Sequence, residues 1–458
     1  MKKWLAGILA RFNAGQIAVL SFGTVILVGT VLLMLPLSTN GKPLGFVDSL
    51  FTSTSAVCVT GLIVVDTGSR FTTFGQGVIL GLIQVGGFGI MTFSTFILFV
   101  LGRRASITVV EAAGGSFLKL SRYSLTELML RALVFTAAVE AAGFILLFSR
   151  FIFDFEIGQA LWLSFFHSVS AFCNAGFSLF SDSLVGYAGD PLVNFTVMIQ
   201  IIAGGIGFFV VVDLWDSLRR HDDPAKRRIS FHTKIVLTMT VLLVLGGTVI
   251  IYLIERNHGL SGLPWYQGVQ RALFQSVTAR TAGFNTMDTG SLANASLFLL
   301  VVLMAIGGAP GSMAGGVKVT TAGVLLIVVF GRLMRRRTAS IFGRSVAEAD
   351  LERAVSLMLI STVIIAGVTL VLLVTELGGT PHPESRGLMA EILFETVSAF
   401  GTVGLSTGAT PELGVAGRLI ITATMFAGRL GPLTLVFAME RKKSIQRFRY
   451  PEEKIMIG

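Results

Sequence analysis

The sequence predicts an all-α polytopic membrane protein in which four tandem repeats surround one central pore. Hydrophobic residues make up 53% of the 458 residues and charged residues only 14%, and several apolar runs are long enough to cross about 30 Å of hydrocarbon as helices. A glycine-centred sequence also recurs four times, at Gly61, Gly176, Gly283 and Gly404, with separations of 115, 107 and 121 residues. Four such loops in a membrane protein indicate a pseudo-four-fold ring of backbone, from which an ion filter can be built.

The apolar segments fall into four sets, each with a long segment, a short one and a second long one. The four repeats are expected at 16–101, 127–216, 234–330 and 353–439, their pore loops at 47–62, 160–177, 267–284 and 388–405, and the terminal segments at 1–15 and 440–458. Each short segment holds about 11 to 13 apolar residues, a length typical of a re-entrant segment rather than a span.

The distribution of basic residues decides the topology. Five short stretches hold 25 of the 36 lysines and arginines: 1–15, 102–126, 217–234, 331–353 and 440–458. If every short segment crossed the membrane, successive basic clusters would lie on opposite sides. If each short segment enters and returns, all five clusters lie on the cytoplasmic side with both termini, as the positive-inside rule requires. The sequence therefore predicts eight transmembrane helices and four pore half-helices. The net charge of +10 then reflects topology and contact with membrane lipids, and no nucleic acid is expected.

The four glycines explain how the loops could form a filter. Carbonyl oxygens that replace an ion's hydration shell must turn toward the axis, and glycine adopts the required positive φ without a steric cost. The expected filter residues are Val59, Thr60, Gly61, Asn174, Ala175, Gly176, Thr281, Ala282, Gly283, Thr402, Val403 and Gly404, with the cation at the carbonyls of Thr60, Asn174, Thr281 and Thr402. No ring of acidic side chains accompanies them, which favours a monovalent cation over Ca²⁺. The C-terminal ends of the half-helices would favour a cation, and Asp48 suits the start of the first one.

A break in the second long segment of the third set predicts a gate. Residues 307–316 contain five glycines and a proline, which break a helix, so an irregular loop is expected below the filter, mobile unless it is only a static kink. The expected gate residues are Gly307, Gly308, Pro310, Gly311, Gly315, Gly316, Lys318 and Arg429. A charge at membrane depth needs a partner, so the Arg429 guanidinium should donate to carbonyls of this loop; the alternative is extension to the cytosolic surface. Lys318 is either part of the gate or an interface anchor.

Five further residues are considered for roles outside the filter and gate. Arg280, three residues before Gly283, either sets the field near the outer mouth or packs and hydrogen-bonds behind the filter. His167 and His232 are expected to be structural or interfacial, since no cysteine or acidic residue clusters with them as a metal site. The cysteines, Cys58 and Cys173, are expected to be small wall residues rather than a disulfide.

The motifs together resemble the Trk/Ktr/HKT superfamily of potassium transporters, in particular the bacterial KtrB-like membrane subunits. The resemblance covers nearly the whole chain and rests on the four loops, on Gln84–Gly89 and on the glycine-rich break. It implies K⁺ uptake across the bacterial inner membrane, with Gly61 rather than serine indicating K⁺ and with Na⁺ as a candidate activator. It also implies a homodimer on a separate cytosolic KtrA-like nucleotide-binding ring, a gating role for the 307–316 loop and a gate-contacting arginine at Arg429, and no bound cofactor.

Three other functions compete with that of a channel-like K⁺ uptake subunit. An alternating-access symporter coupled to Na⁺ or H⁺ would show inverted repeats and paired broken helices. Here the repeats share one orientation, and only one second span is expected to be strongly broken. An intramembrane enzyme would need a nucleophile–base pair, and a voltage-gated channel would need arginine-rich spans; the sequence contains neither.

Overall fold

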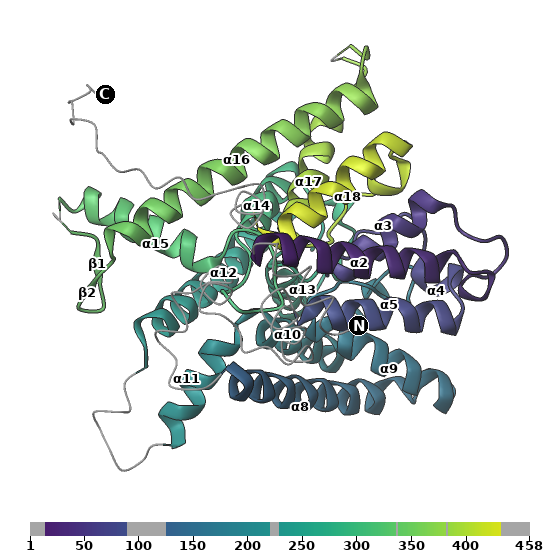
Figure 1. The fold of residues 1–458 in the computed structure, drawn as a ribbon, viewed down its shortest axis with the longest axis horizontal. Coiled ribbons are helices and arrows are strands. Elements are labelled where there is room, and N and C mark those ends of the chain that lie inside the picture. The colour runs from purple at the N-terminus through teal and green to yellow at the C-terminus, as the bar shows by residue number, and fades with distance from the viewer. Residues whose placement is uncertain (1–13, 89–124, 220–228, 336–337, 382, 432–458) are drawn as a thin grey trace, which may run out of the picture.

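Helices form nearly all of the regular structure in the computed structural model, which describes residues 14–88, 125–219, 229–335, 338–381 and 383–431 (Figure 1). The expected terminal segment 440–458, almost all of 1–15 and the basic stretch 102–126 except its last two residues lie outside the described residues. Between α15 and α16 a short antiparallel hairpin pairs Ser340–Ile341 (β1) with Arg344–Ser345 (β2).

The main helices follow the order of the expected sets. The first set holds α2 (Ala14–Met34), α3 (Phe46–Val57) and α5 (Thr73–Gly87); the second holds α8 (Leu125–Phe151), α9 (Ile157–Phe172), α10 (Pro191–Gly205) and α11 (Phe208–Arg219); the third holds α12 (Phe231–Glu255), α13 (Trp265–Thr278), α14 (Asn294–Ala305) and α15 (Val319–Leu333); and the fourth holds α16 (Glu348–Leu377), α17 (Leu388–Gly401) and α18 (Val415–Leu430). A single turn of helix, α4 (Thr67–Arg70), lies between α3 and α5.

Local capping explains where several of these helices begin. The Thr72 hydroxyl accepts a hydrogen bond from the Gly75 backbone N–H at the start of α5, and Ser230 caps α12 in the same way. Asp190 caps α10, and Pro191 follows at the first helical position, where its missing N–H costs nothing. The caps satisfy backbone donors that the first turn of a helix leaves free.

Four helices are long and apolar enough to cross a membrane: α2, α8, α12 and α16. Their outward faces carry exposed large apolar side chains, such as Val363, Leu370 and Val374 on α16. A water-facing helix would not present such a surface, whereas lipid accommodates it. Helix α5 ends at Gly87, next to residues outside the description, and α18 likewise ends at Leu430.

The second set holds a break that the sequence did not predict. Helices α10 and α11 together are long and apolar enough for a span, but they bend by 95° at the residues between them. Gly204, Gly205 and Gly207 surround this bend, and Gly207 has a φ of +89°. The expectation of only one strongly broken second span is therefore wrong. Three glycines within four residues weaken a helix even without a proline.

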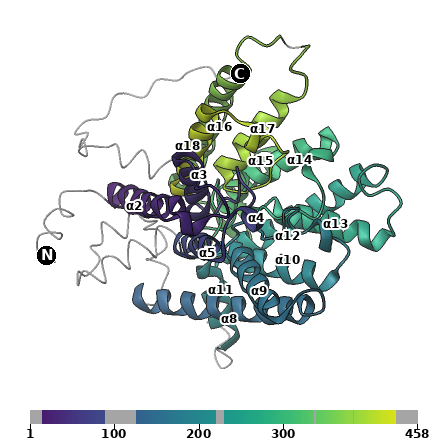
Figure 2. The ribbon, with the colours of Figure 1, turned by 90° about the vertical axis from the view of Figure 1, so that its right-hand side faces the viewer.

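The sets pack in sequence order around a common centre, as Figure 2 shows. In the first, second and fourth sets the short helix packs against the long helix before it and against the helix after it. In the third set, α12 packs against both the short helix α13 and the following helix α14. Between sets, α5 packs against α9, α10 against α13, α14 against α17, and α18 against α3. The last of these contacts joins the end of the described chain to its beginning, so the arrangement is cyclic.

Candidate functional site: ion filter and gate

Each short helix ends directly before one of the four glycine loops, which we define as residues 58–62, 173–177, 279–284 and 402–405. The helix ends are deeply buried; every residue of α3 from Phe51 to Val57 is buried, and so is every residue of α17 from Phe394 to Gly401. The C-terminal ends of four helices therefore converge on the loops. Their partial negative charges favour a cation there.

The backbone of each loop enters the left-handed region twice, at the glycine and at the residue two positions before it. The φ angles in these two positions are +54° and +91° at Val59 and Gly61, +58° and +69° at Asn174 and Gly176, +72° and +78° at Thr281 and Gly283, and +50° and +93° at Thr402 and Gly404. Non-glycine residues rarely adopt a positive φ, so one repeated conformation in four loops is a built feature.

The four glycines form a closed ring of contacts. A Cβ atom added to Gly61 would lie 2.5 Å from the carbonyl oxygen of Ala175, and one added to Gly176 would lie 2.7 Å from that of Ala282. In the same way a Cβ on Gly283 would collide with the Val403 carbonyl, and one on Gly404 with the Thr60 carbonyl. Each loop thus abuts the next, and the fourth returns to the first.

The expected set of cation-binding carbonyls combines two levels of the loops. The carbonyls that face a neighbouring glycine belong to the residue directly before each glycine, namely Thr60, Ala175, Ala282 and Val403. The expected set combined Thr60 from this level with Asn174, Thr281 and Thr402, which lie one residue earlier. The residue equivalent to these three is Val59, which shares their positive φ.

Sequence reasoning assigned no role to the serine or threonine that opens each motif. The residue before each glycine donates its N–H to the carbonyl of Ser55, Ser170 or Ser398 at 2.8 Å, or of Thr278 at 2.9 Å. The Ser55 and Ser170 hydroxyls also donate to the residue after the glycine, each at 2.7 Å, and Thr278 does so at 2.8 Å. The recurrence of a serine or threonine at the start of each motif was the sequence signal that could have revealed this role. In the third loop it lies one residue closer to the glycine.

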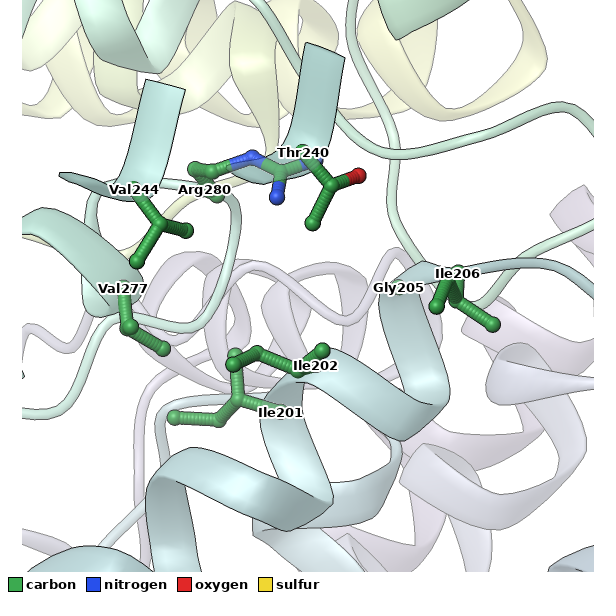
Figure 3. A pocket seen from close by; sticks show the side chains of 8 residues that line it. All are labelled: Ile201, Ile202, Gly205, Ile206, Thr240, Val244, Val277 and Arg280. Carbon is green, nitrogen blue, oxygen red and sulfur yellow. The ribbon is translucent and has the colours of Figure 1, made fainter. Parts of the chain in front are cut away.

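Arg280 belongs to the third loop, and its side chain points into the protein. Its side chain is 7% exposed and lines a small pocket between α10, α12 and α13, where it extends toward Thr240 (Figure 3). The other lining residues are Ile201, Ile202, Gly205, Ile206, Val244 and Val277. Within the described residues, Arg280 Nε and Thr240 Oγ1 lack hydrogen-bond partners. The position fits the packing alternative, although the hydrogen bonds expected with it are not seen.

The predicted break between α14 and α15 is an irregular loop, residues 306–318, whose ends are tied together. The Gly307 N–H donates to the Val317 carbonyl at 2.8 Å, and the Val319 N–H donates to the Gly308 carbonyl at 3.0 Å. The loop contacts the fourth glycine loop, because a Cβ on Gly315 would collide with the Thr402 side chain. It therefore lies against the ring of glycine loops.

The same loop is bonded to the break in the second set. The Ala309 N–H donates to the Gly205 carbonyl at 2.9 Å, and the Met313 N–H donates to the Gly204 carbonyl at 3.1 Å. In return the Phe208 N–H donates to the Gly311 carbonyl at 3.0 Å. The unpredicted bend of α10 and α11 thus exposes backbone groups that hold the 306–318 loop.

Arg429 is 8% exposed and contacts this loop from the other side. Its guanidinium donates to the Met313 carbonyl, and also to the Gly86 carbonyl at 2.5 Å and the Gly87 carbonyl at 3.3 Å. The alternative in which Arg429 extends to the surface is wrong for this structure. Lys318 donates to the Ala314 carbonyl at 2.7 Å, so it belongs to the loop rather than to an interface.

Other expected contacts lie around the ring. Asp48, in the first turn of α3, accepts a 2.7 Å hydrogen bond from Arg418 of α18. Cys58 and Cys173 are both buried and free. His167 is buried against the second loop, and its Nε2 lies 3.0 Å from the Ser178 hydroxyl.

These observations define a helical membrane protein with a closed ring of backbone loops, and the comparisons identify its class. The profile of the TrkH family of cation transport proteins matches residues 8–447. The chain belongs to this family, and the resemblance expected from its motifs is confirmed. A family of cation transporters is not one of enzymes.

Relatives and a solved structure are consistent with the assignment. The chain is 38% identical to Ktr system potassium uptake protein B of Bacillus subtilis over 100% of its own length and 98% of that protein. It is 37% identical to the protein of the same name from Vibrio alginolyticus, over 98% and 96% of the two chains, and 36% identical to potassium/sodium uptake protein NtpJ of Enterococcus hirae, over 98% of each. The crystal structure of the potassium transporter TrkH from Vibrio parahaemolyticus matches with a TM-score of 0.70 over 93% of this chain and 84% of that chain, at 19% identity.

Proposed function

We propose that this chain is the ion-conducting subunit of a bacterial potassium uptake system. The observation that carries the proposal is the closed ring of four glycine loops, in which each glycine abuts the backbone of the next loop. A ring of carbonyl-rich backbone at the ends of four helices is suited to a dehydrated monovalent cation. The names of relatives that share over a third of its residues support K⁺ as the cargo, since two are potassium uptake proteins and one is a potassium/sodium uptake protein. A role of Na⁺ as activator is part of the proposal that the names do not address.

In this proposal the residues before and at the four glycines are the selectivity filter. K⁺ would bind between carbonyls of the residue directly before each glycine and carbonyls of the residue one position earlier. The positive φ at the same two positions of every loop supports this arrangement, because a repeated backbone conformation gives the successive carbonyls a similar orientation in all four loops. No acidic side chain belongs to the four loops, so backbone oxygens would replace the hydration shell.

The 306–318 loop would be the gate, and Arg429 would hold it closed. The loop adjoins the filter through Gly315, and it is bonded on one side to the bend of the second set and on the other to Arg429. Glycines at positive φ, Gly311 and Gly316, could absorb the backbone change when the loop moves.

The proposed topology has eight spans and four re-entrant half-helices, with both termini in the cytoplasm of the inner membrane. The concentration of basic residues in five short stretches supports it. We also propose a homodimer that sits on a separate nucleotide-binding ring, as the family resemblance implies. The names of relatives that belong to a Ktr system support a partner subunit. A pulldown of this chain with such a ring protein from membranes would test the partnership.

The test of the filter is potassium uptake in a strain that lacks its own uptake systems. Wild-type chain should restore growth at low K⁺, whereas Gly61→Ser and Gly404→Ser should raise the K⁺ concentration for half-maximal uptake and admit Na⁺. Both variants add a Cβ where a neighbouring backbone carbonyl leaves no space. Gly246→Ser, in the membrane helix α12 where a Cβ meets no atom, is the control and should behave as wild type. Unchanged K⁺ affinity and Na⁺ discrimination in both filter variants would refute the assignment.

A further inference from the structure

A buried carboxylate fastens the fourth glycine loop to the helix that precedes it. Glu395 of α17 is 1% exposed, yet no lysine or arginine pairs with it within the described residues. It accepts four hydrogen bonds instead. Its Oε1 accepts from the Ser406 hydroxyl at 2.7 Å, the Thr407 N–H at 2.9 Å and the Thr407 hydroxyl at 3.2 Å, and its Oε2 accepts from the Thr410 hydroxyl.

The four donors lie two, three and six residues beyond Gly404. Ser398, one turn later on the same helix, holds the near side of the loop, because its carbonyl accepts from the Val403 N–H at 2.8 Å and its hydroxyl accepts from the Gly404 N–H at 3.1 Å. The fourth loop is therefore fixed to α17 on both sides of its glycine.

The position of Glu395 lies three residues before the serine or threonine that opens each motif. The other three sets have a different residue at this position. In the second set it is His167, which contacts Ser178 at 3.0 Å and accepts from the Leu179 N–H at 3.4 Å. These two partners lie two and three residues beyond Gly176, as Ser406 and Thr407 do beyond Gly404. The same fastening thus exists in the second set, with two contacts in place of four.

The first and third sets lack the fastening. Gln275 is the third-set equivalent and is fully buried, but neither its Oε1 nor its Nε2 has a partner within the described residues. The hydroxyls of Thr286 and Thr289, which correspond to Thr407 and Thr410, are also without partners there. Thr52 in the first set has an unpartnered hydroxyl as well. The ring thus contains one firmly fastened loop, one less so, and two without this contact.

We propose that Glu395 is a positioning residue that sets the preference for K⁺ over Na⁺ by fixing the fourth loop. The inference rests on the proposed function, in which these loops are the filter. A filter discriminates between ions through the placement of its carbonyls, and four hydrogen bonds to one buried side chain hold the fourth loop in place. Because the loops abut one another, a fourth loop held in place also limits the movement of the first and third, which contact it directly.

The experiment compares Glu395→Ala with Gln275→Ala, the matched position without hydrogen bonds. The readout is the ratio of K⁺ to Na⁺ uptake in proteoliposomes, with folding checked by thermal melting of the purified chain. Glu395→Ala should lower the ratio about tenfold, roughly the effect of losing one strong hydrogen bond, while Gln275→Ala should leave it unchanged. Glu395→Gln keeps the shape and one acceptor oxygen, which can retain up to three of the four hydrogen bonds, and should lie between wild type and Glu395→Ala.

An unchanged ratio in folded Glu395→Ala would overturn the proposal. If that variant does not fold, Thr410→Val and Ser406→Ala each remove one of the four hydrogen bonds, and unchanged ratios in both variants overturn it too. Gly404→Ser, measured in parallel, separates the two proposals. If Gly404→Ser alters the ratio and the Glu395 variants do not, the filter stands and the anchor is wrong; if Gly404→Ser also has no effect, the filter assignment itself fails.

Discussion

Replacing Arg429 with alanine should increase the basal potassium flux through the purified chain. The guanidinium donates to one carbonyl of the 306–318 loop, that of Met313, and to two carbonyls of the first set, those of Gly86 and Gly87. A hydrogen bond from a charged donor is worth about 1.5–3 kcal/mol, so losing the single bond to the loop favours the open gate by roughly 10- to 150-fold. Arg429→Lys keeps a charge but cannot reach both sides at once, and should give a smaller increase.

The assay is ⁸⁶Rb⁺ uptake into proteoliposomes that contain the chain without any cytosolic partner. Arg418→Ala is the matched control, since Arg418 lies on the same helix and pairs with Asp48 rather than with the gate loop. Its flux should match that of wild type, while Arg429→Ala should exceed it by at least the lower figure. If Arg429→Ala is folded and its flux equals that of Arg418→Ala, the latch does not exist.

Two further predictions concern the gate loop and the loop after α8. Deletion of 309–314 removes most of the bonded part of the gate and should give fast flux that no longer responds to a cytosolic partner; slow, regulated flux after the deletion would contradict a gating role. Outside the membrane helices, hydrogen bonds from Arg150 and Tyr187 lower the pKa of Asp154, so this carboxylate stabilises the fold above its unfolded pKa and loses that contribution as the pH falls through its folded value. The melting temperature should therefore decline less steeply below about pH 4 in Asp154→Asn than in wild type; equal declines would exclude the linkage.

The features predicted best from the sequence are those in which residue type alone restricts the backbone. Gly61 and its three equivalents stood out because few other residues adopt a positive φ, and the break before Val319 stood out because proline and glycine end a helix. Arg429 was conspicuous as a charge in the interior of an apolar span. In each case the composition of a short segment carried the information.

Features that depend on contacts between distant segments were missed. The bend near Gly205 contains no proline and lies in an apolar run that reads as a continuous span. Glu395 looks like one polar residue in a helix, because its partners matter only once the chain has turned back. The expected carbonyl set combined two levels because the first loop was represented by Thr60. Nothing in the sequence reveals that Val59 has the positive φ shared by Asn174, Thr281 and Thr402.

The packing of α18 against α3 has a mechanical consequence for the molecule. Every other junction between neighbouring sets is also bridged by the peptide chain, whereas the seam between the last set and the first is held, among the described residues, by non-covalent contacts. Two arginines of α18 cross it eleven residues apart, Arg418 to Asp48 at one end and Arg429 to Gly86 at the other. That spacing corresponds to about 16 Å of helix, half the thickness of the hydrocarbon layer. Arg429 therefore contacts both this seam and the gate loop. A shift of α18 relative to the first set and a movement of the gate loop would both change the hydrogen bonds of the same guanidinium.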